Sequence, residues 1–287
     1  MSKEKILILG SNGFIGKNAV EFFAEKSFDV YSPKRQELNL LDTHAVESYL
    51  ADLKPDYVLM SAVNIQSLEE NVQTYFNLQR CTCYYKKMIT IGSGAEYDMR
   101  NYVPKMTEEY FKKNIPADTY GLSKFIVGND VEHHAGKILN LRVFGIFGKY
   151  EDYTRRFISN NICRALAGLD ISLNQDMLFD YIYVQDFLQL LPNLFETKTQ
   201  FNNYNICSNE PVSLLRLAKE IQRIHPGNVE ITVKADGSRG EYSGCNSRFS
   251  TEFGPIDETP FSQSIEELYQ WYANHPNLTL FLDKVRG

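Results

Sequence analysis

Short apolar runs alternate along the chain with segments in which apolar residues recur every three or four positions. The runs are Ile6 to Leu9, Phe28 to Ser32, Lys54 to Val63 and Met88 to Ile91, and each predicts a strand, the first of them buried on both faces. From Phe14 onward the apolar positions follow helical spacing. Strands that alternate with helices predict an α/β fold built on a parallel sheet.

Three glycines stand where the first strand gives way to the first helix. Gly10, Gly13 and Gly16 are spaced three apart. Glycine permits a tight turn and a close approach of backbone to ligand, while a helix start offers free N–H groups to a pyrophosphate. The turn therefore predicts a dinucleotide site, with contacts from Gly10, Ser11, Asn12, Gly13, Phe14, Ile15 and Gly16.

The end of the second strand predicts which dinucleotide binds. An acidic residue there would bind the ribose of NAD, but the chain has Lys34 and Arg35. Two cations suit the 2′-phosphate of NADP, so we expect NADP, with NAD as the alternative and a solvated basic loop as the competing interpretation. Asp42 is placed to reach the adenine, and the small pair Ser61 and Ala62 is expected to border the pyrophosphate.

A set of catalytic side chains is predicted after the third strand. The strand from Met88 ends near Ser93, and "YGLSK" places Tyr120 and Lys124 four apart, on one face of a helix. A nearby ammonium favours the phenolate, so such a pair can exchange a proton near neutral pH, while Ser93 holds the substrate oxygen. By itself this spacing is a weak motif, but it is strong downstream of a glycine turn.

Composition excludes several other classes of protein. The chain has 287 residues, of which 43% are hydrophobic, and a formal net charge of −6 with no cluster of basic residues, so we expect no nucleic-acid partner. The five cysteines lack metal-ligand spacing, so we expect no metal. No apolar run suits a signal peptide or a membrane span, and we expect a cytoplasmic protein with no membrane partner.

With these segments in view, the chain resembles the extended short-chain dehydrogenase/reductases that act on nucleotide sugars as epimerases, dehydratases or reductases. The matching segments include "GSNGFIG", "LNLLD", "GSGAEY", "YGLSK", "LRVFGIFG" and "DYIYVQD". The resemblance implies a Rossmann-like, doubly wound parallel sheet and a smaller C-terminal domain that binds the nucleotide-diphosphate sugar. It also implies a homodimer formed through the helix that carries Tyr120 and the helix before it.

Within this family, the residues after the serine strand separate the reactions. Dehydratases have an Asp-Glu pair where this chain has Gly94 and Ala95. The pattern is close to that of the GDP-fucose synthases, but they carry a Cys at the position of Ala95 and a His near Arg156, which serve their epimerisation. The resemblance therefore implies NADPH-dependent reduction of a 4-keto (deoxy)sugar.

Substrate contacts are expected in the second half of the chain. Arg155, Arg156 and Asn160 follow a glycine turn where relatives bind the substrate's nucleotide, although a solvated helix start is the alternative. Relatives usually have Arg where this chain has Phe179, and Arg239 lies where they clamp the diphosphate. Residues 1–150 are expected to form the dinucleotide domain, to which about 179–220 return, with 151–287 forming an interleaved substrate domain.

Two alternative functions and several simpler interpretations stay open. The chain could be a C4 epimerase that keeps NAD bound, or a dinucleotide sensor without catalysis, although the Tyr-Lys pair favours an enzyme. Glu96 and Asp98 are expected to be loop carboxylates. His133 and His134 are expected to face solvent on the helix that carries Tyr120, and the aromatic residues around Trp271 predict a C-terminal core helix.

Overall fold

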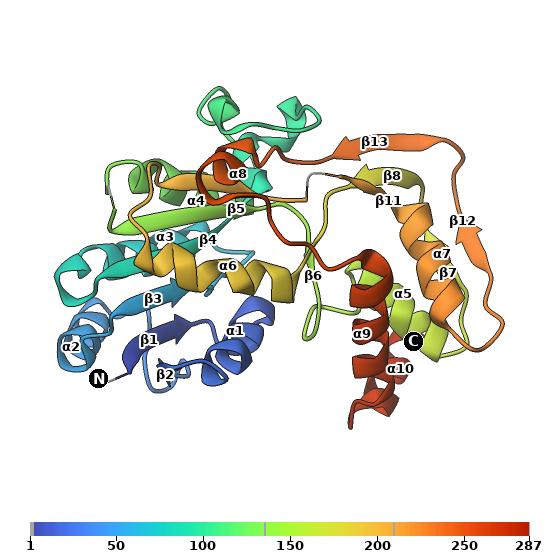
Figure 1. The fold of residues 1–287 in the computed structure, drawn as a ribbon, viewed down its shortest axis with the longest axis horizontal. Helices are drawn as coiled ribbons and strands as arrows, with labels where there is room; N and C mark the ends of the chain where they lie inside the picture. The colour runs from blue at the N-terminus through green and yellow to red at the C-terminus, as the bar shows by residue number, and fades with distance from the viewer. Residues whose placement is uncertain (1–2, 135, 209, 287) are drawn as a thin grey trace.

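The computed structural model describes residues 3–134, 136–208 and 210–286. Its centre is a six-stranded sheet in the order β10-β5-β4-β3-β1-β2, in which every neighbouring pair is parallel (Figure 1). The strands are β1 (Glu4–Leu9), β2 (Phe28–Tyr31), β3 (Tyr57–Met60), β4 (Lys87–Ser93), β5 (Ile138–Val143) and β10 (Asn203–Ile206).

Side chains of the sheet point alternately into two cores, one on each face. In β1, Ile6 and Ile8 join the core beneath α1 (Phe14–Ala24) and α6 (Val184–Glu196). Leu7 and Leu9 join the other core, which is covered by α2 (Thr43–Leu53), α3 (Leu68–Gln79) and α4 (Thr119–Val131). The predicted doubly wound α/β sheet is thereby confirmed. β3, in the middle of the sheet, is apolar throughout because both of its faces are buried.

Residues from beyond position 180 complete this sheet. The α6 helix packs on the same face as α1, where the Phe195 and Tyr57 ring centroids are 4.9 Å apart. After α6, β10 pairs with β5, with Asn203 opposite Asn140. The boundaries expected for the two domains stay a prediction.

Most of the remaining elements lie beside the sheet, to its right in Figure 1, whereas α8 packs on β10 at the edge of the sheet. Small sheets join β8 with β11 and β13, β7 with β12, and β6 with β9. The helices α5, α7, α9 and α10 pack around them. The elements are β6 (Ile146–Phe147), α5 (Phe157–Leu166), β7 (Ile171–Leu173), β8 (Asp176–Phe179), β9 (Ile182–Tyr183), β11 (Val212–Ser213), α7 (Leu214–Ile224), β12 (Ile231–Val233), β13 (Ser238–Tyr242), α8 (Ser247–Phe253), α9 (Phe261–Ala273) and α10 (Leu278–Arg286).

Some local expectations differ from the structure. The third strand is shorter than predicted, because Lys54 ends α2 in the left-handed conformation and β3 begins only at Tyr57. The α4 helix ends at Val131, so His133 and His134 follow it, and His134 contacts Asp130 at 2.9 Å.

The aromatic C-terminal segment is helical, as predicted. It forms α9, in which Ile265, Leu268 and Tyr272 are buried while Trp271 is half-buried. Among the described residues, no helix combines the length and apolar character needed to span a membrane.

Candidate active site

The glycine turn between β1 and α1 is packed too closely to accept side chains at two positions. Gly10 has φ +85°, and a Cβ atom there would lie 2.5 Å from the Ala62 nitrogen. A Cβ atom on Gly16 would overlap the Gly10 carbonyl oxygen. Gly13 begins α1 without a side-chain cap, so the first N–H groups of the helix are left for a ligand. This cradle fits the pyrophosphate of a dinucleotide.

The turn opens into a cavity of about 1570 Å³ at the carboxyl ends of the sheet strands. Gly16 does not line this cavity, since it packs behind the turn. In an open parallel sheet this edge is where ligands bind. Residues predicted for the cofactor that do line it are Gly10, Ser11, Asn12, Gly13, Phe14, Ile15, Arg35, Ser61, Ala62 and Tyr120.

Only one of the three polar residues predicted at the adenosine end lines the cavity. Arg35 does so, whereas Lys34 and Asp42 do not. The Lys34 backbone N–H donates to the Glu37 carboxylate at 2.6 Å. The Asp42 carboxylate caps α2, accepting from the backbone N–H groups of the first turn at 3.0 Å, a role typical of an aspartate at this position.

Ser93, Tyr120 and Lys124 converge, as the sequence predicts. Ser93 ends β4, lines the cavity and shares a hydrogen bond with the Tyr120 side chain. Lys124, one helical turn after Tyr120, is buried behind the cavity wall, and its Nζ donates to the Ile91 carbonyl oxygen at 2.6 Å. Its Nζ lies 5.9 Å from the centroid of the Tyr120 ring.

Burial shifts the pKa values of both Tyr120 and Lys124. Burial raises the pKa of Tyr120, although the Ser93 hydrogen bond and the charge of Arg156 oppose that rise. Burial also lowers the pKa of Lys124 to about 8, against the opposing effect of Glu96. On balance the pKa of Tyr120 is raised, because desolvation outweighs the neighbouring charges. The expectation that Lys124 lowers the pKa of Tyr120 stays a prediction.

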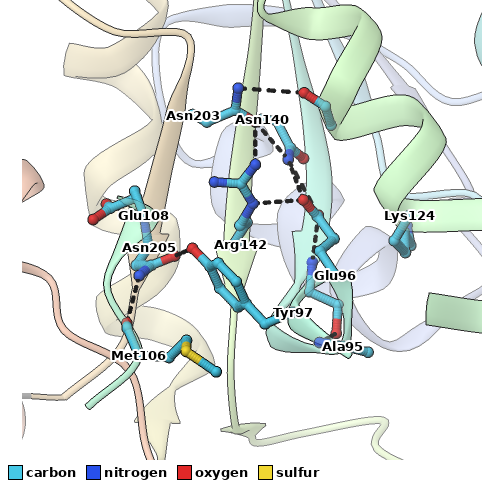
Figure 2. A network of polar contacts seen from close by, with 12 residues as sticks. Ala95, Glu96, Tyr97, Met106, Glu108, Lys124, Asn140, Arg142, Asn203 and Asn205 are labelled. Atoms are coloured by element: carbon cyan, nitrogen blue, oxygen red, sulfur yellow. Dashed lines mark hydrogen bonds and ion pairs between the residues drawn. The ribbon is translucent and has the colours of Figure 1, made fainter. Parts of the chain in front are cut away.

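A buried polar network centred on Glu96 binds the backbone of Ser93; Figure 2 shows Glu96 with its partners Asn140 and Arg142. The Glu96 carboxylate accepts from the Ser93 backbone N–H at 3.1 Å, from Asn140 Nδ2 at 3.2 Å and from Arg142 Nε at 2.5 Å. Glu96 is fully buried, so the interpretation of this residue as a loop carboxylate is wrong. Cβ atoms on Gly92 and Gly128 would overlap its two oxygens, which shows that both glycines make room for this carboxylate.

The side chains of Asp98 and Tyr97 also form their hydrogen bonds away from the cavity. The Asp98 carboxylate is buried and accepts from the side chains of Arg100 and Asn101. The Tyr97 hydroxyl donates to Asn205 Oδ1 at 2.6 Å (Figure 2). Neither side chain lines the cavity.

Some of the residues predicted to bind the substrate lie at the other end of the cavity. Arg156, at the start of α5, and Arg239, on β13, both line it and are exposed. Arg155 and Asn160 do not line it, and Asn160 Nδ2 donates to the Tyr153 carbonyl oxygen at 2.9 Å. Phe179 does line the cavity, and its ring stacks on Tyr181 with centroids 4.6 Å apart.

Two features of this end escaped the sequence reasoning. Glu151 is a buried carboxyl that lines the cavity and accepts from the Ser159 hydroxyl at 2.7 Å. Burial raises the pKa of Glu151 to about 8. The second feature is an aromatic wall, whose rings contact one another and line the cavity: Tyr102, Phe144, Phe179, Tyr181 and Tyr242.

Known proteins resemble this chain in both sequence and structure. The chain is 21% identical to the GDP-L-colitose synthase of Yersinia pseudotuberculosis, over 95% of this chain and 99% of that protein. The GDP-L-fucose synthetase of Naegleria fowleri superposes with a TM-score of 0.81 at 18% identity, over 96% of this chain and 94% of that one.

A Campylobacter jejuni GDP-mannoheptose C4 reductase with NADP bound also superposes, with a TM-score of 0.81 at 18% identity over 96% of this chain and 99% of that one. The model of the NAD dependent epimerase/dehydratase family matches residues 6–207, more than half of the chain. The chain therefore belongs to the NAD dependent epimerase/dehydratase family.

Proposed function

We propose that this chain catalyses NADPH-dependent reduction of the 4-keto group of a nucleotide-diphosphate deoxysugar, in sugar-nucleotide biosynthesis. The observation that carries the proposal is the meeting of Ser93 and Tyr120 with the glycine turn in one cavity, with Lys124 directly behind them. The relatives named for GDP-sugar synthesis and C4 reduction support it.

Each of the three side chains takes a distinct role. The Ser93 hydroxyl binds the keto oxygen, and Tyr120 protonates this oxygen as negative charge develops on it. Lys124 supplies positive charge beneath Tyr120 and binds the nicotinamide ribose. When bound, the reduced nicotinamide supplies a hydride to the carbonyl carbon.

The substrate's diphosphate is assigned to the two arginines at the far end of the cavity. Arg156 and Arg239 both line it, and guanidinium groups can bind phosphate oxygens in pairs. Arg239 compensates for Phe179, which replaces the arginine usual in relatives. Arg155 and Asn160 do not line the cavity; Asn160 lies in the first turn of α5, and Arg156 is the N-cap residue of this helix.

For the cofactor we propose NADP rather than NAD, on the strength of Arg35. Arg35→Ala is expected to weaken NADPH binding by roughly 10-fold, the effect of one charge-assisted hydrogen-bonded pair, and to leave NADH binding nearly unchanged. Lys34→Ala is the matched control and should have a smaller effect, since Lys34 does not line the cavity. Fluorescence titration with each coenzyme measures these affinities. An equal loss of affinity for NADPH and NADH would contradict the assignment of Arg35 to the 2′-phosphate.

The alternative of a C4 epimerase is distinguished by the same measurement. An epimerase retains NAD through its catalytic cycle, so it would purify with bound NAD and show no preference for a 2′-phosphate. A dissociable coenzyme that binds through Arg35 favours the reductase.

Proton exchange at the sugar carbons tests the proposed reaction. Ala95 and Arg156 stand where related epimerases have their carbon acid and base, so we expect no deuterium at C3 or C5 when GDP-4-keto-6-deoxymannose is reduced in D₂O. Loss of NADPH absorbance reports turnover, and mass spectrometry with NMR locates any label. Deuterium at either carbon would show that epimerisation accompanies reduction.

We also propose a homodimer and a cytoplasmic location. The dimer is expected to form through α3 and α4, and Phe76 on α3 is 38% exposed, which suits an apolar interface there. Light scattering combined with size exclusion tests the assembly, and a monomeric mass at micromolar concentration would contradict it.

A further inference from the structure

Tyr242, the last residue of β13, lines the same cavity as Ser93 and Tyr120. Its backbone is fixed, because β13 pairs with β8 with Tyr242 opposite Phe179, and the Tyr242 carbonyl oxygen accepts from the Asp180 N–H at 2.9 Å. Its ring packs on Phe179 and Phe144, with centroids 4.9 and 5.5 Å away. The direction of the side chain is therefore set by the fold.

The hydroxyl of Tyr242 lies against the residue that follows Ser93. A Cβ atom on Gly94 would come closer than 3.0 Å to this oxygen, a distance that real Cβ atoms essentially never show. The same Cβ atom would lie 2.8 Å from the Phe144 ring. Because Gly94 has no side chain, the Tyr242 hydroxyl can occupy this space. It therefore lies beside the residue that directly follows Ser93, which is proposed to bind the keto oxygen.

No hydrogen bond joins the Tyr242 hydroxyl to any described residue. The nearby phenols differ, since Tyr102 bonds the backbone of Ser243 and Tyr97 bonds Asn205. Burial, together with Tyr102, Tyr120 and Asp180, raises the pKa of Tyr242 well above its usual value, so the phenol is a neutral donor at physiological pH. A phenol that lines a cavity with its polar atom unused suits a ligand hydroxyl.

We propose that Tyr242 is a specificity-determining residue whose hydroxyl hydrogen-bonds the C3 hydroxyl of the sugar. The inference rests on the proposed function, in which Ser93 holds the C4 oxygen. A group beside Gly94 then reaches a substituent on a carbon next to C4. In a 4-keto-6-deoxysugar the neighbouring carbons are C5, which carries a methyl group and the ring oxygen, and C3, which carries a hydroxyl.

The test is Tyr242→Phe, assayed with GDP-4-keto-6-deoxymannose and its 3-deoxy analogue. Because the bond exists both in the bound substrate and in the transition state, we expect KM to rise by roughly 10-fold for the 3-hydroxy sugar, with kcat nearly unchanged. For the 3-deoxy sugar, wild type and variant should agree within about 2-fold, because the bond is missing in both cases. Thermal stability and NADPH affinity should not change, since no internal hydrogen bond is lost.

Tyr49→Phe is the matched control, since it removes a phenol oxygen from α2, none of whose residues lines the cavity. Calorimetric titration of both sugars in the presence of NADP⁺ gives their Kd values without turnover. Failure of the wild type to reduce either sugar would refute the proposed function. The Kd values would still decide the role of Tyr242 in that case. Wild-type Kd and KM values for the 3-hydroxy sugar in Tyr242→Phe would overturn the inference. An equal loss for both sugars would also overturn it.

Discussion

Tyr120→Phe is expected to lower the rate of hydride transfer by roughly 10² to 10⁴, the range typical of losing a general acid, while NADPH and sugar affinities stay close to wild type. The ring keeps its place because Phe retains its shape, and only the hydroxyl that shares a hydrogen bond with Ser93 is removed. Single-turnover oxidation of bound NADPH, followed by its absorbance, measures the effect without interference from product release.

Two further variants, Lys124→Ala and Ser93→Ala, distinguish the roles of these residues from that of Tyr120. Lys124→Ala should damage both turnover and coenzyme binding, because Lys124 is buried close to the Tyr120 ring and is proposed to bind the nicotinamide ribose. Ser93→Ala should cost a smaller factor, about that of one hydrogen bond to developing charge. Hydride transfer at the wild-type rate in Tyr120→Phe would contradict the assignment, and Tyr97 and Glu96 could not easily replace it since both are bonded away from the cavity.

Glu96→Gln is expected to lower the free energy of unfolding by about 3 to 5 kcal/mol, the typical cost of leaving one partner of a buried ion pair without its counter-charge. Glu96 and Arg142 are 0% and 1% exposed, so water cannot compensate the Arg142 guanidinium. Asn203 Oδ1, which accepts from Arg142 at 3.1 Å, is a neutral acceptor and compensates only in part. Urea unfolding followed by circular dichroism measures the change.

The control for this prediction is a surface ion pair. Glu47→Gln removes the partner of Arg80, where both side chains are at least 40% exposed, and it should change stability by less than about 1 kcal/mol. A second variant, Glu96→Gln with Arg142→Met, should recover part of the loss because the unpaired charge is gone. If Glu96→Gln and Glu47→Gln unfold at the same urea concentration, the buried pair does not stabilise the fold as argued.

The parts of the candidate site whose geometry agrees with the sequence prediction are those fixed by local structure. The glycine turn joins adjacent elements, and Tyr120 and Lys124 lie on one helix, so their spacing alone determines their relative positions. Likewise, the alternation of apolar runs and helical segments determined the doubly wound sheet. Asp42 shows a limit of such reasoning, since an aspartate directly before a helix is also an N-cap signal, and the structure uses it so.

The parts that the sequence did not predict depend on contacts between distant segments. Glu96 and Arg142 are 46 residues apart, and only the pairing of β4 with β5 brings them together. Two polar residues at alternate positions of a buried strand, Asn140 and Arg142, were a signal that some buried partner exists, although they do not name it. Tyr242 and Glu151 reach the cavity through the smaller sheets and loops, whose placement no local pattern reveals.

The most direct test of the central claim is the fate of a labelled hydride. With NADPH deuterated at the transferable position of nicotinamide C4 and a GDP-4-keto-6-deoxysugar in ordinary water, the account predicts one deuterium at C4 of the product sugar, located by NMR, for each NADPH oxidised. Oxidation of the coenzyme with no deuterium at C4 of the sugar would contradict it.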